Sequence, residues 1–124
     1  MLGDPALAAD SDLRRLRVLY RALGDLTRLR IIGLLAEAGP MPVNKLSERV
    51  LLSQPLISWH LRILRLAGFI DTERHGREVI CRLRPAAFGE LHTAEEALLS
   101  GAPRGRAVAP STPAGEEEAT ASVG

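Results

Sequence analysis

The strongest constraint on the fold is a pair of short helical patterns, over residues 43–50 and 53–67, which lie only about three residues apart. In both patterns apolar residues recur at steps of three and four residues, as the buried side of a helix requires. These positions are Val43, Leu46 and Val50 in the first pattern and Ile57, Leu61 and Leu64 in the second. Ser53 can cap the second helix. So short a connection forces the two helices to pack together, which predicts a helix-turn-helix.

Further amphipathic helices are predicted on both sides of this pair. Leucines recur at helical spacing over about residues 11–23, and a second apolar repeat follows Asp25, which can act as its cap. Gly39 and the proline after it end that repeat. A last helical pattern begins at Pro85 and reaches about Ser100.

Between the fourth and the last helical patterns the apolar period changes to two. Val79, Cys81 and Leu83 alternate with their neighbours, and residues 74–77 supply a turn, which predicts a two-stranded hairpin. The chain is therefore expected to be mostly α with a small β-hairpin, in the order α-α-α-α-β-β-α. That order is the one found in a winged helix-turn-helix with an extra helix at each end.

One domain over residues 11–100 accounts for these patterns. Residues 1–10 are expected to form a flexible N-terminus, and residues 101–124, rich in Gly, Pro, Ala, Ser and Thr, a disordered tail. No apolar run approaches the roughly 18 to 20 residues that span a bilayer, and residues 1–12 carry acids but no base, unlike a signal peptide. A cytoplasmic protein without membrane contact is therefore predicted.

The distribution of charge is uneven, although the whole chain has a formal net charge of only +1. Residues 13–84 hold 14 Lys and Arg against 6 Asp and Glu, a net charge of +8, and 13 of the 14 bases are arginine. Arginine presents a planar set of donors to phosphate or guanine, so this composition fits contact with nucleic acid. A solvated basic surface is the alternative.

The outer side of the helix predicted over residues 53–67 is where double-stranded DNA is expected to bind, because a helix fits the major groove. The DNA-contacting residues expected on it are Ser53, Gln54, Pro55, Ser58, Trp59 and Arg62. Arg74 and Arg77 beside the hairpin turn can hold phosphates or enter a minor groove. Arg28 and Arg30 are further candidates for phosphate contact, or one of them for pairing with Asp25 or Glu37. These positions predict a sequence-specific transcriptional regulator.

Trp59 also supports two other interpretations. Its ring can pack against a neighbouring helix, or it can form with Leu56 a patch that docks a partner protein. An enzyme is not expected, because the sequence has no paired carboxylates, no nucleophile with a base and no glycine-rich phosphate loop. The single cysteine, Cys81, cannot form an internal disulfide and is expected to be a small buried side chain.

The first and last helices are too apolar for a core of three short helices to cover. The residues concerned are Leu13, Leu16 and Leu23 in the first helix and Phe88, Leu91 and Leu98 in the last. A two-fold partner would bury them, so the chain is expected to be a homodimer that dimerises through these two helices. Two recognition helices about one turn of DNA apart would read a palindrome-like operator.

The segment from Leu23 to Leu83 resembles the ArsR/SmtB family of repressors. The resemblance is carried by DLTRLRII, SQPLISWHLRILRLAGFI and ERHGREVICRL. It implies a winged helix-turn-helix that represses transcription as a dimer. Members of that family commonly have a histidine at the position of His60, expected here to be a packing residue, and often a glycine at that of Leu51. A left-handed turn at Leu51 would cost about 1 kcal/mol.

Many proteins of the resembling family bind a metal that weakens DNA binding, but the usual ligand positions are occupied by other residues here. They fall on Pro42, Asn44, Pro85 and Ala87, none of which supplies a thiolate, imidazole or carboxylate. The remaining candidates for a transition-metal effector are His92, Glu95 and Glu96, whose missing ligands a second chain would supply. A solvated helix face is the other interpretation, and no cofactor is required.

Overall fold

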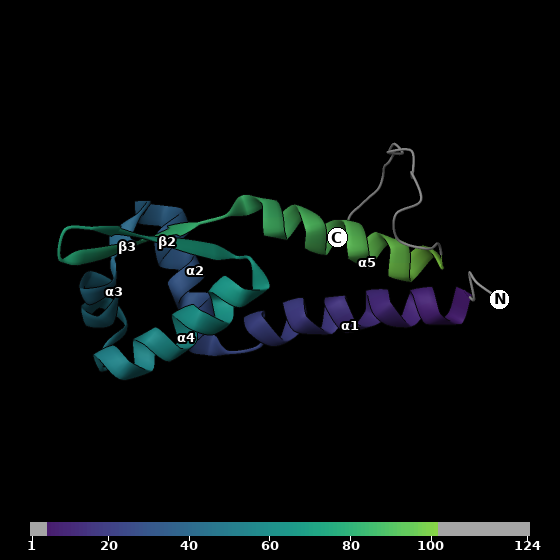
Figure 1. The fold of residues 1–124 in the computed structure, drawn as a ribbon, viewed down its shortest axis with the longest axis horizontal. Helices are drawn as coiled ribbons and strands as arrows, with labels where there is room; N and C mark the ends of the chain where they lie inside the picture. Colours follow the sequence, from purple (N-terminus) through teal and green to yellow (C-terminus); the bar gives the residue numbers. More distant parts are fainter. Residues whose placement is uncertain (1–4, 102–124) are drawn as a thin grey trace.

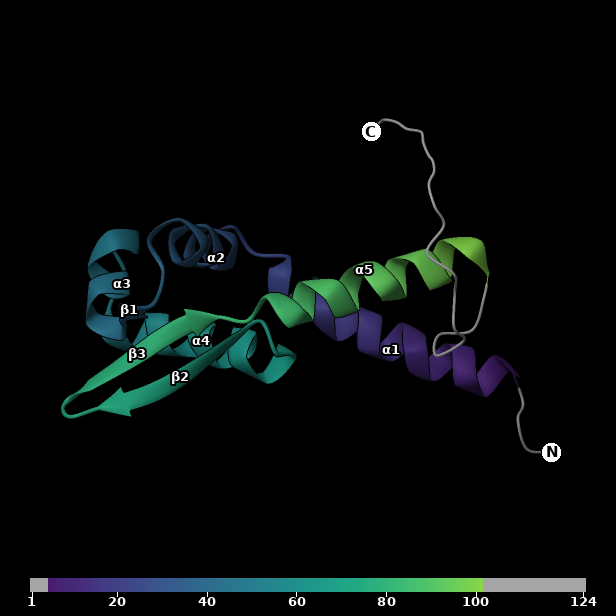
Figure 2. The same ribbon diagram turned by 90° about the horizontal axis from the view of Figure 1, so that it is seen from above.

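The computed structural model of the chain describes residues 5–101, which form five helices and a three-stranded sheet. The helices are α1 (Pro5–Leu23), α2 (Leu26–Ala38), α3 (Val43–Val50), α4 (Gln54–Ala67) and α5 (Pro85–Ser100), and the strands are β1 (Met41–Pro42), β2 (Ile70–His75) and β3 (Glu78–Leu83). We call residues 26–83 the head and α1 with α5 the arm. The two arm helices lie side by side and extend away from the head (Figures 1 and 2). Among the described residues, no helix combines the length and apolar character needed to cross a membrane.

The helices of the head begin and end where the sequence predicted. The Asp25 carboxylate accepts a hydrogen bond from the backbone N–H of Arg28 at 3.0 Å, which caps α2. Gly39 ends α2 and Gly68 ends α4, both with positive φ angles that glycine adopts without steric cost. The predicted bounds of the helix-turn-helix are therefore confirmed.

Two expected features differ from the structure. The first helix begins at Pro5 rather than near residue 11, so part of the segment expected to be flexible is helical. Proline suits the first turn of a helix, and the alanines and leucine that follow it favour helix formation. The sheet also has a third strand, β1, which is too short to show a period of two. Most of the predicted tail, residues 102–124, lies outside the described residues.

The sheet is antiparallel, with β3 between β1 and β2. β1 pairs with the middle of β3 through Met41 opposite Cys81. The pairing of β2 with β3 ends at His75 opposite Glu78, which leaves Gly76 and the following arginine as a two-residue turn. Gly76 has a φ of 66°, as the first central residue of a type II′ turn requires. This hairpin is the predicted wing.

The core lies where α1, the head helices and the sheet meet. Its fully buried side chains are Leu19, Ile31, Leu46, Ile57, Leu64, Phe69, Ile70 and Cys81. The expectation that Cys81 is buried is thus confirmed, and burial, helped by the nearby charge of Asp71, raises the pKa of its thiol to about 12. Phe69 packs on Phe88 of α5 with ring centroids 4.8 Å apart. This ring pair joins the head to the arm.

Arg15 joins the two arm helices to each other and to the head. Arg15 of α1 contacts both carboxylate oxygens of Glu90 in α5, at 2.8 and 3.0 Å. The same guanidinium donates to the backbone carbonyl of Ala67, at the end of α4, at 3.2 Å. Three helices therefore meet at one side chain, and the bond to Glu90 raises the pKa of Arg15.

Candidate nucleic-acid interface

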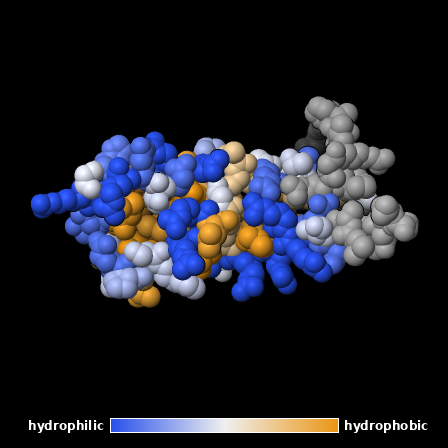
Figure 3. All heavy atoms as spheres, viewed as in Figure 1, coloured by the Kyte–Doolittle hydropathy of each residue, from blue (hydrophilic) through white to orange (hydrophobic). Residues whose placement is uncertain are grey.

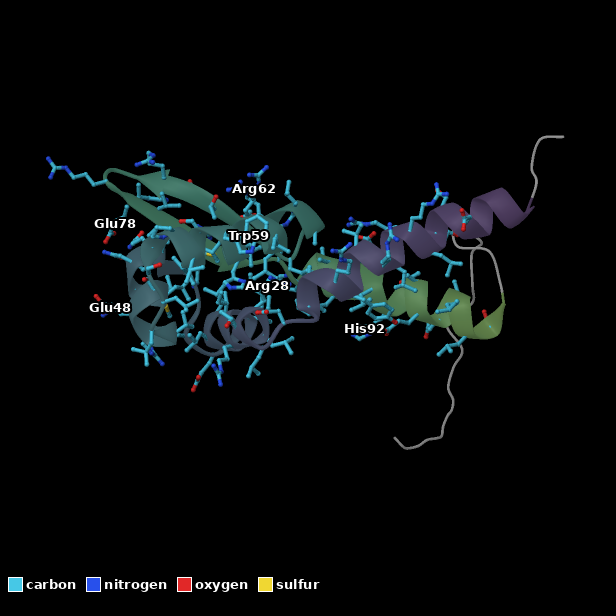
Figure 4. The ribbon with its side chains drawn as sticks, turned by 90° about the horizontal axis from the view of Figure 1, so that it is seen from below. Arg28, Glu48, Trp59, Arg62, Glu78 and His92 are labelled. Carbon is cyan, nitrogen blue, oxygen red and sulfur yellow. The ribbon has the colours of Figure 1, made fainter. Side chains whose placement is uncertain are left out.

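The outer side of α4 is exposed as the sequence predicted. Its inner side buries Ile57, Leu61, Leu64 and Ala67. The outward residues Gln54, Pro55, Ser58, Trp59 and Arg62 are all exposed. Trp59 is 56% exposed, so its ring is not part of the core of this chain. Trp59 and Arg62 both project from α4 in the head (Figure 4).

The turn before α4 sets how this helix is presented. Ser53 is exposed, and its hydroxyl accepts a hydrogen bond from the Leu56 backbone N–H at 3.4 Å, which caps α4. Leu51 has φ 58° and ψ 46°, so the left-handed position that favours glycine is held by leucine. The Leu52 N–H donates to the Ser47 carbonyl at 3.1 Å, and the Ser47 hydroxyl donates to the Leu52 carbonyl. These bonds hold the turn in spite of its strain.

Two arginines lie beside the tip of the wing. Arg74 and Arg77 are exposed, and within residues 5–101 neither forms an ion pair. Two acids of the wing are held by another base, since Arg82 approaches Glu73 at 3.2 Å and Asp71 at 3.9 Å. The charges of the two tip arginines are consequently available to an anion from outside the chain.

Arg62 is the corresponding exposed cation of α4. It has no ion-pair or hydrogen-bond partner in the part of the chain that the structure describes. One turn further along, Arg65 donates from Nη1 to the Thr72 hydroxyl at 3.4 Å, which ties α4 to β2. α4 and the wing are therefore held as one surface, and both carry arginines without a partner among the described residues.

The guanidinium of Arg28, a candidate either for phosphate contact or for pairing with an acid, is bound within the chain by other groups. Its guanidinium donates to the carbonyls of Ala22 and Arg21 at the end of α1, at 2.7 and 3.1 Å. A third nitrogen lies 3.0 Å from Nδ1 of His60 in α4, whose side chain is only 13% exposed. His60 is thus a packing residue, as predicted. The backbone N–H of Arg28, with the charges of Arg28 and His60, lowers the pKa of Asp25.

Comparison with known proteins identifies the family. Residues 25–72 match the family model described as "Bacterial regulatory protein, arsR family". A crystal structure described as an ArsR family transcriptional regulator is 31% identical, with a TM-score of 0.59, and the match covers 71% of this chain and 86% of that one. The chain belongs to the ArsR family.

Two further similarities concern this ArsR-family chain. The HTH-type transcriptional repressor SmtB of Mycobacterium tuberculosis is 43% identical over 86 residues, which cover 64% of this chain and 63% of that protein. A homodimeric winged helix-turn-helix domain from Mycobacterium bovis has the same fold, with a TM-score of 0.60 at 21% identity over 81% of this chain and 87% of that one. The chain spans 62 to 65% of the length of the first curated relatives it matches.

The arm of this ArsR-family chain buries only part of the surface predicted for dimerisation. Leu16 and Leu91 lie in the core of the single chain, and Leu23 and Phe88 are partly buried against it. Leu13 and Leu98 remain about half exposed. They border an open groove along α1 that is also lined by Leu16, Arg17, Tyr20, Arg21, Gly24 and Arg28. The surface left for a partner is thus smaller than the sequence suggested.

The predicted metal residues are only partly brought together. Nδ1 of His92 lies 3.4 Å from one carboxylate oxygen of Glu95, while the other accepts a hydrogen bond from the Tyr20 hydroxyl at 2.9 Å. That bond raises the pKa of Tyr20. Glu96 is exposed and joins no such contact, and residues 5–101 contain no group of three or more potential metal ligands. At the family's usual positions, Pro42, Asn44, Pro85 and Ala87 offer no metal-binding side chain.

Proposed function

We propose that this ArsR-family chain is a transcriptional regulator that inserts α4 into the major groove of double-stranded DNA and sets its wing against the backbone. The observation that carries the proposal is the joined surface of α4 and the wing, on which Arg62, Arg74 and Arg77 are exposed without partners among residues 5–101. Exposed Gln54 and Ser58 supply hydrogen-bonding groups for base edges on the same helix.

We further propose that it acts as a repressor and as a homodimer on a palindrome-like operator. Its similarity to a protein named as a repressor supports the first part, and the homodimeric domain of the same fold supports the second. Leu13 and Leu98 along the groove of the arm are apolar surface that a second copy would cover. Two heads would then contact half-sites about 34 Å apart.

The test is a mobility-shift titration with the DNA upstream of the gene, at low and at moderate salt. Arg62→Ala should weaken binding by about 1 to 3 kcal/mol if Arg62 contacts a base. Arg77→Ala should weaken binding to all sequences alike and make it less dependent on salt, as expected for a phosphate contact. Arg14→Ala is the matched control, because Arg14 is exposed but lies on the arm beside Asp10. A chain that shifts no sequence preferentially would contradict the proposal.

A second candidate function is docking of an acidic partner protein through Trp59 and Leu56, and the exposure of both side chains favours it. Trp59→Ala separates the two functions. Loss of partner capture with unchanged DNA affinity would favour docking.

For the effector we propose a transition metal bound by His92 and Glu95, with further ligands from a second protomer. The 3.4 Å approach of these two side chains supports the proposal. Added Zn²⁺ should weaken the DNA shift of the wild-type chain and leave that of His92→Ala unchanged. An equal response of both chains would contradict this site.

A further inference from the structure

The outer surface of α4 is divided lengthwise into two chemically different halves. One half is polar and contains Gln54, Ser58, Arg62 and Arg65. The other half is apolar, since Leu56, Trp59 and Leu66 recur with Ile63 at steps of three and four residues along one side. Leu56, Trp59 and Leu66 are 49, 56 and 69% exposed. Hydrophobic residues interrupt the hydrophilic surface along α4 and where it approaches α1 (Figure 3).

The two halves face different neighbours. Arg65 on the polar half donates to Thr72, so this half borders the wing. The apolar half borders His60, which contacts Arg28, so it lies on the side of α2. Trp59 therefore lies between Arg62, which has no partner among residues 5–101, and the first turn of α2, as Figure 4 also shows. A large apolar side chain in this basic setting suits an anionic partner that also carries an apolar group.

Duplex DNA presents such a group. The thymine 5-methyl is the apolar group that bases display in the major groove, where it accompanies the hydrogen-bonding edge of an A·T pair. Phosphates on both sides would meet the arginines of the head, which lies within the segment 13–84 that carries the net charge of +8. Base edges are contacted by the N-terminal part of a recognition helix, which is where Leu56 and Trp59 lie.

We infer that Trp59, assisted by Leu56, selects A·T pairs in the operator by packing on thymine methyl groups. Leu66 lies seven positions beyond Trp59, about 10 Å further along the helix axis, and does not take part. This inference rests on the proposed DNA-binding function and adds to it the chemical group that the apolar half recognises.

The DNA side of the test removes single methyl groups. Duplexes selected by the full chain from a random-sequence pool identify the preferred site, and each thymine in it is then replaced by deoxyuridine. At one or more positions the dissociation constant should rise about fourfold, the loss expected for one buried methyl-sized group. A duplex with a G·C pair at that position is the second comparison. Replacing its cytosine by 5-methylcytosine should recover part of the affinity, because the methyl group returns without the A·T pair.

The protein side of the test assigns the effect to a residue. Trp59→Ala should bring the thymine-to-deoxyuridine affinity ratio close to one, whereas Trp59→Phe should retain part of it. Leu66→Ala is the matched control on the same side of α4 and should leave the ratio unchanged. Equal affinity of the wild-type chain for both bases at every position would overturn the inference while leaving the proposed function intact. A ratio that persists in Trp59→Ala would overturn the role of Trp59, and a chain that selects no duplex would overturn both proposals.

Discussion

The head and the arm of this chain reach stability in different ways. Of the eight largest fully buried side chains, all except Leu19 belong to the head, which supplies most of the core. In the arm, three of the four buried residues of α5 are the alanines Ala87, Ala94 and Ala97, and Leu13 and Leu98 remain about half exposed. The difference teaches that one chain suffices to build the surface proposed for DNA, whereas the arm leaves apolar surface that the proposed second copy would cover.

The largest effect is expected where the head meets the arm. Phe69→Ala removes a fully buried ring and its contact with Phe88, so the free energy of unfolding should fall by about 3 to 5 kcal/mol in a urea titration. Leu66→Ala, at an exposed position, should change it by less than about 0.5 kcal/mol. Similar losses in the two variants would mean that the head does not depend on this core.

The next largest effect is expected on dimerisation through the arm. Replacing Leu13 and Leu98 together by glutamine keeps helix propensity but removes the apolar surface beside the groove. Light scattering should then report single chains, with operator affinity lowered on the order of a hundredfold because the second head is no longer tethered. Leu99→Gln, at an exposed position outside the groove lining, is the control. A double variant that remains dimeric would place the interface elsewhere.

A smaller effect concerns the start of the head at Asp25. Asp25→Ala should cost about 1 kcal/mol of unfolding free energy through loss of the α2 cap, whereas Asp25→Asn keeps a capping oxygen. The folded-state pKa of Asp25 is lowered, so its charge stabilises the fold above the unfolded pKa, near 3.8, and this stabilisation is lost as the pH falls through the folded value. Stability measured between pH 7 and 2.5 should therefore fall less in Asp25→Asn than in the wild type. Parallel curves would argue against this role.

The smallest effect is a gain within the head. Leu51 is 87% exposed, so its side chain contributes little burial, yet its left-handed backbone is unfavourable for leucine. Leu51→Gly should raise the unfolding free energy by about 0.5 kcal/mol, since relief of strain exceeds the entropy that glycine loses on folding. Thermal unfolding followed by circular dichroism measures the change, and a lower midpoint would show that the leucine stabilises the turn.

The head could be predicted from the sequence because its signals are local. Caps at Asp25 and Ser53, the glycine that ends α4 and the period-two wing lie within a few residues of the structures they specify. Outward positions such as Arg62 follow from the same helical period. The described structure bears out their exposure, while contact with DNA stays a prediction.

What the sequence did not reveal depends on contacts between distant residues. Arg15 and Glu90 are 75 positions apart, and no local pattern links them. The engagement of Arg28 with the end of α1 depends on how α2 packs, and β1 becomes a strand only because β3 lies beside it. For the arm, helical spacing identified the apolar residues but not which of them the chain covers itself.

The buried thiol of Cys81 can report how often the sheet opens. It is the single cysteine of the chain and lies on β3, between the other two strands. Burial raises the pKa of its thiol to about 12, so the reactive thiolate is scarce at pH 8 while the sheet is closed. Labelling by a thiol reagent therefore waits for the strands to separate. The mass gained by each chain over time would record how often the wing opens. Bound DNA should lower the rate of labelling if it holds the wing in place.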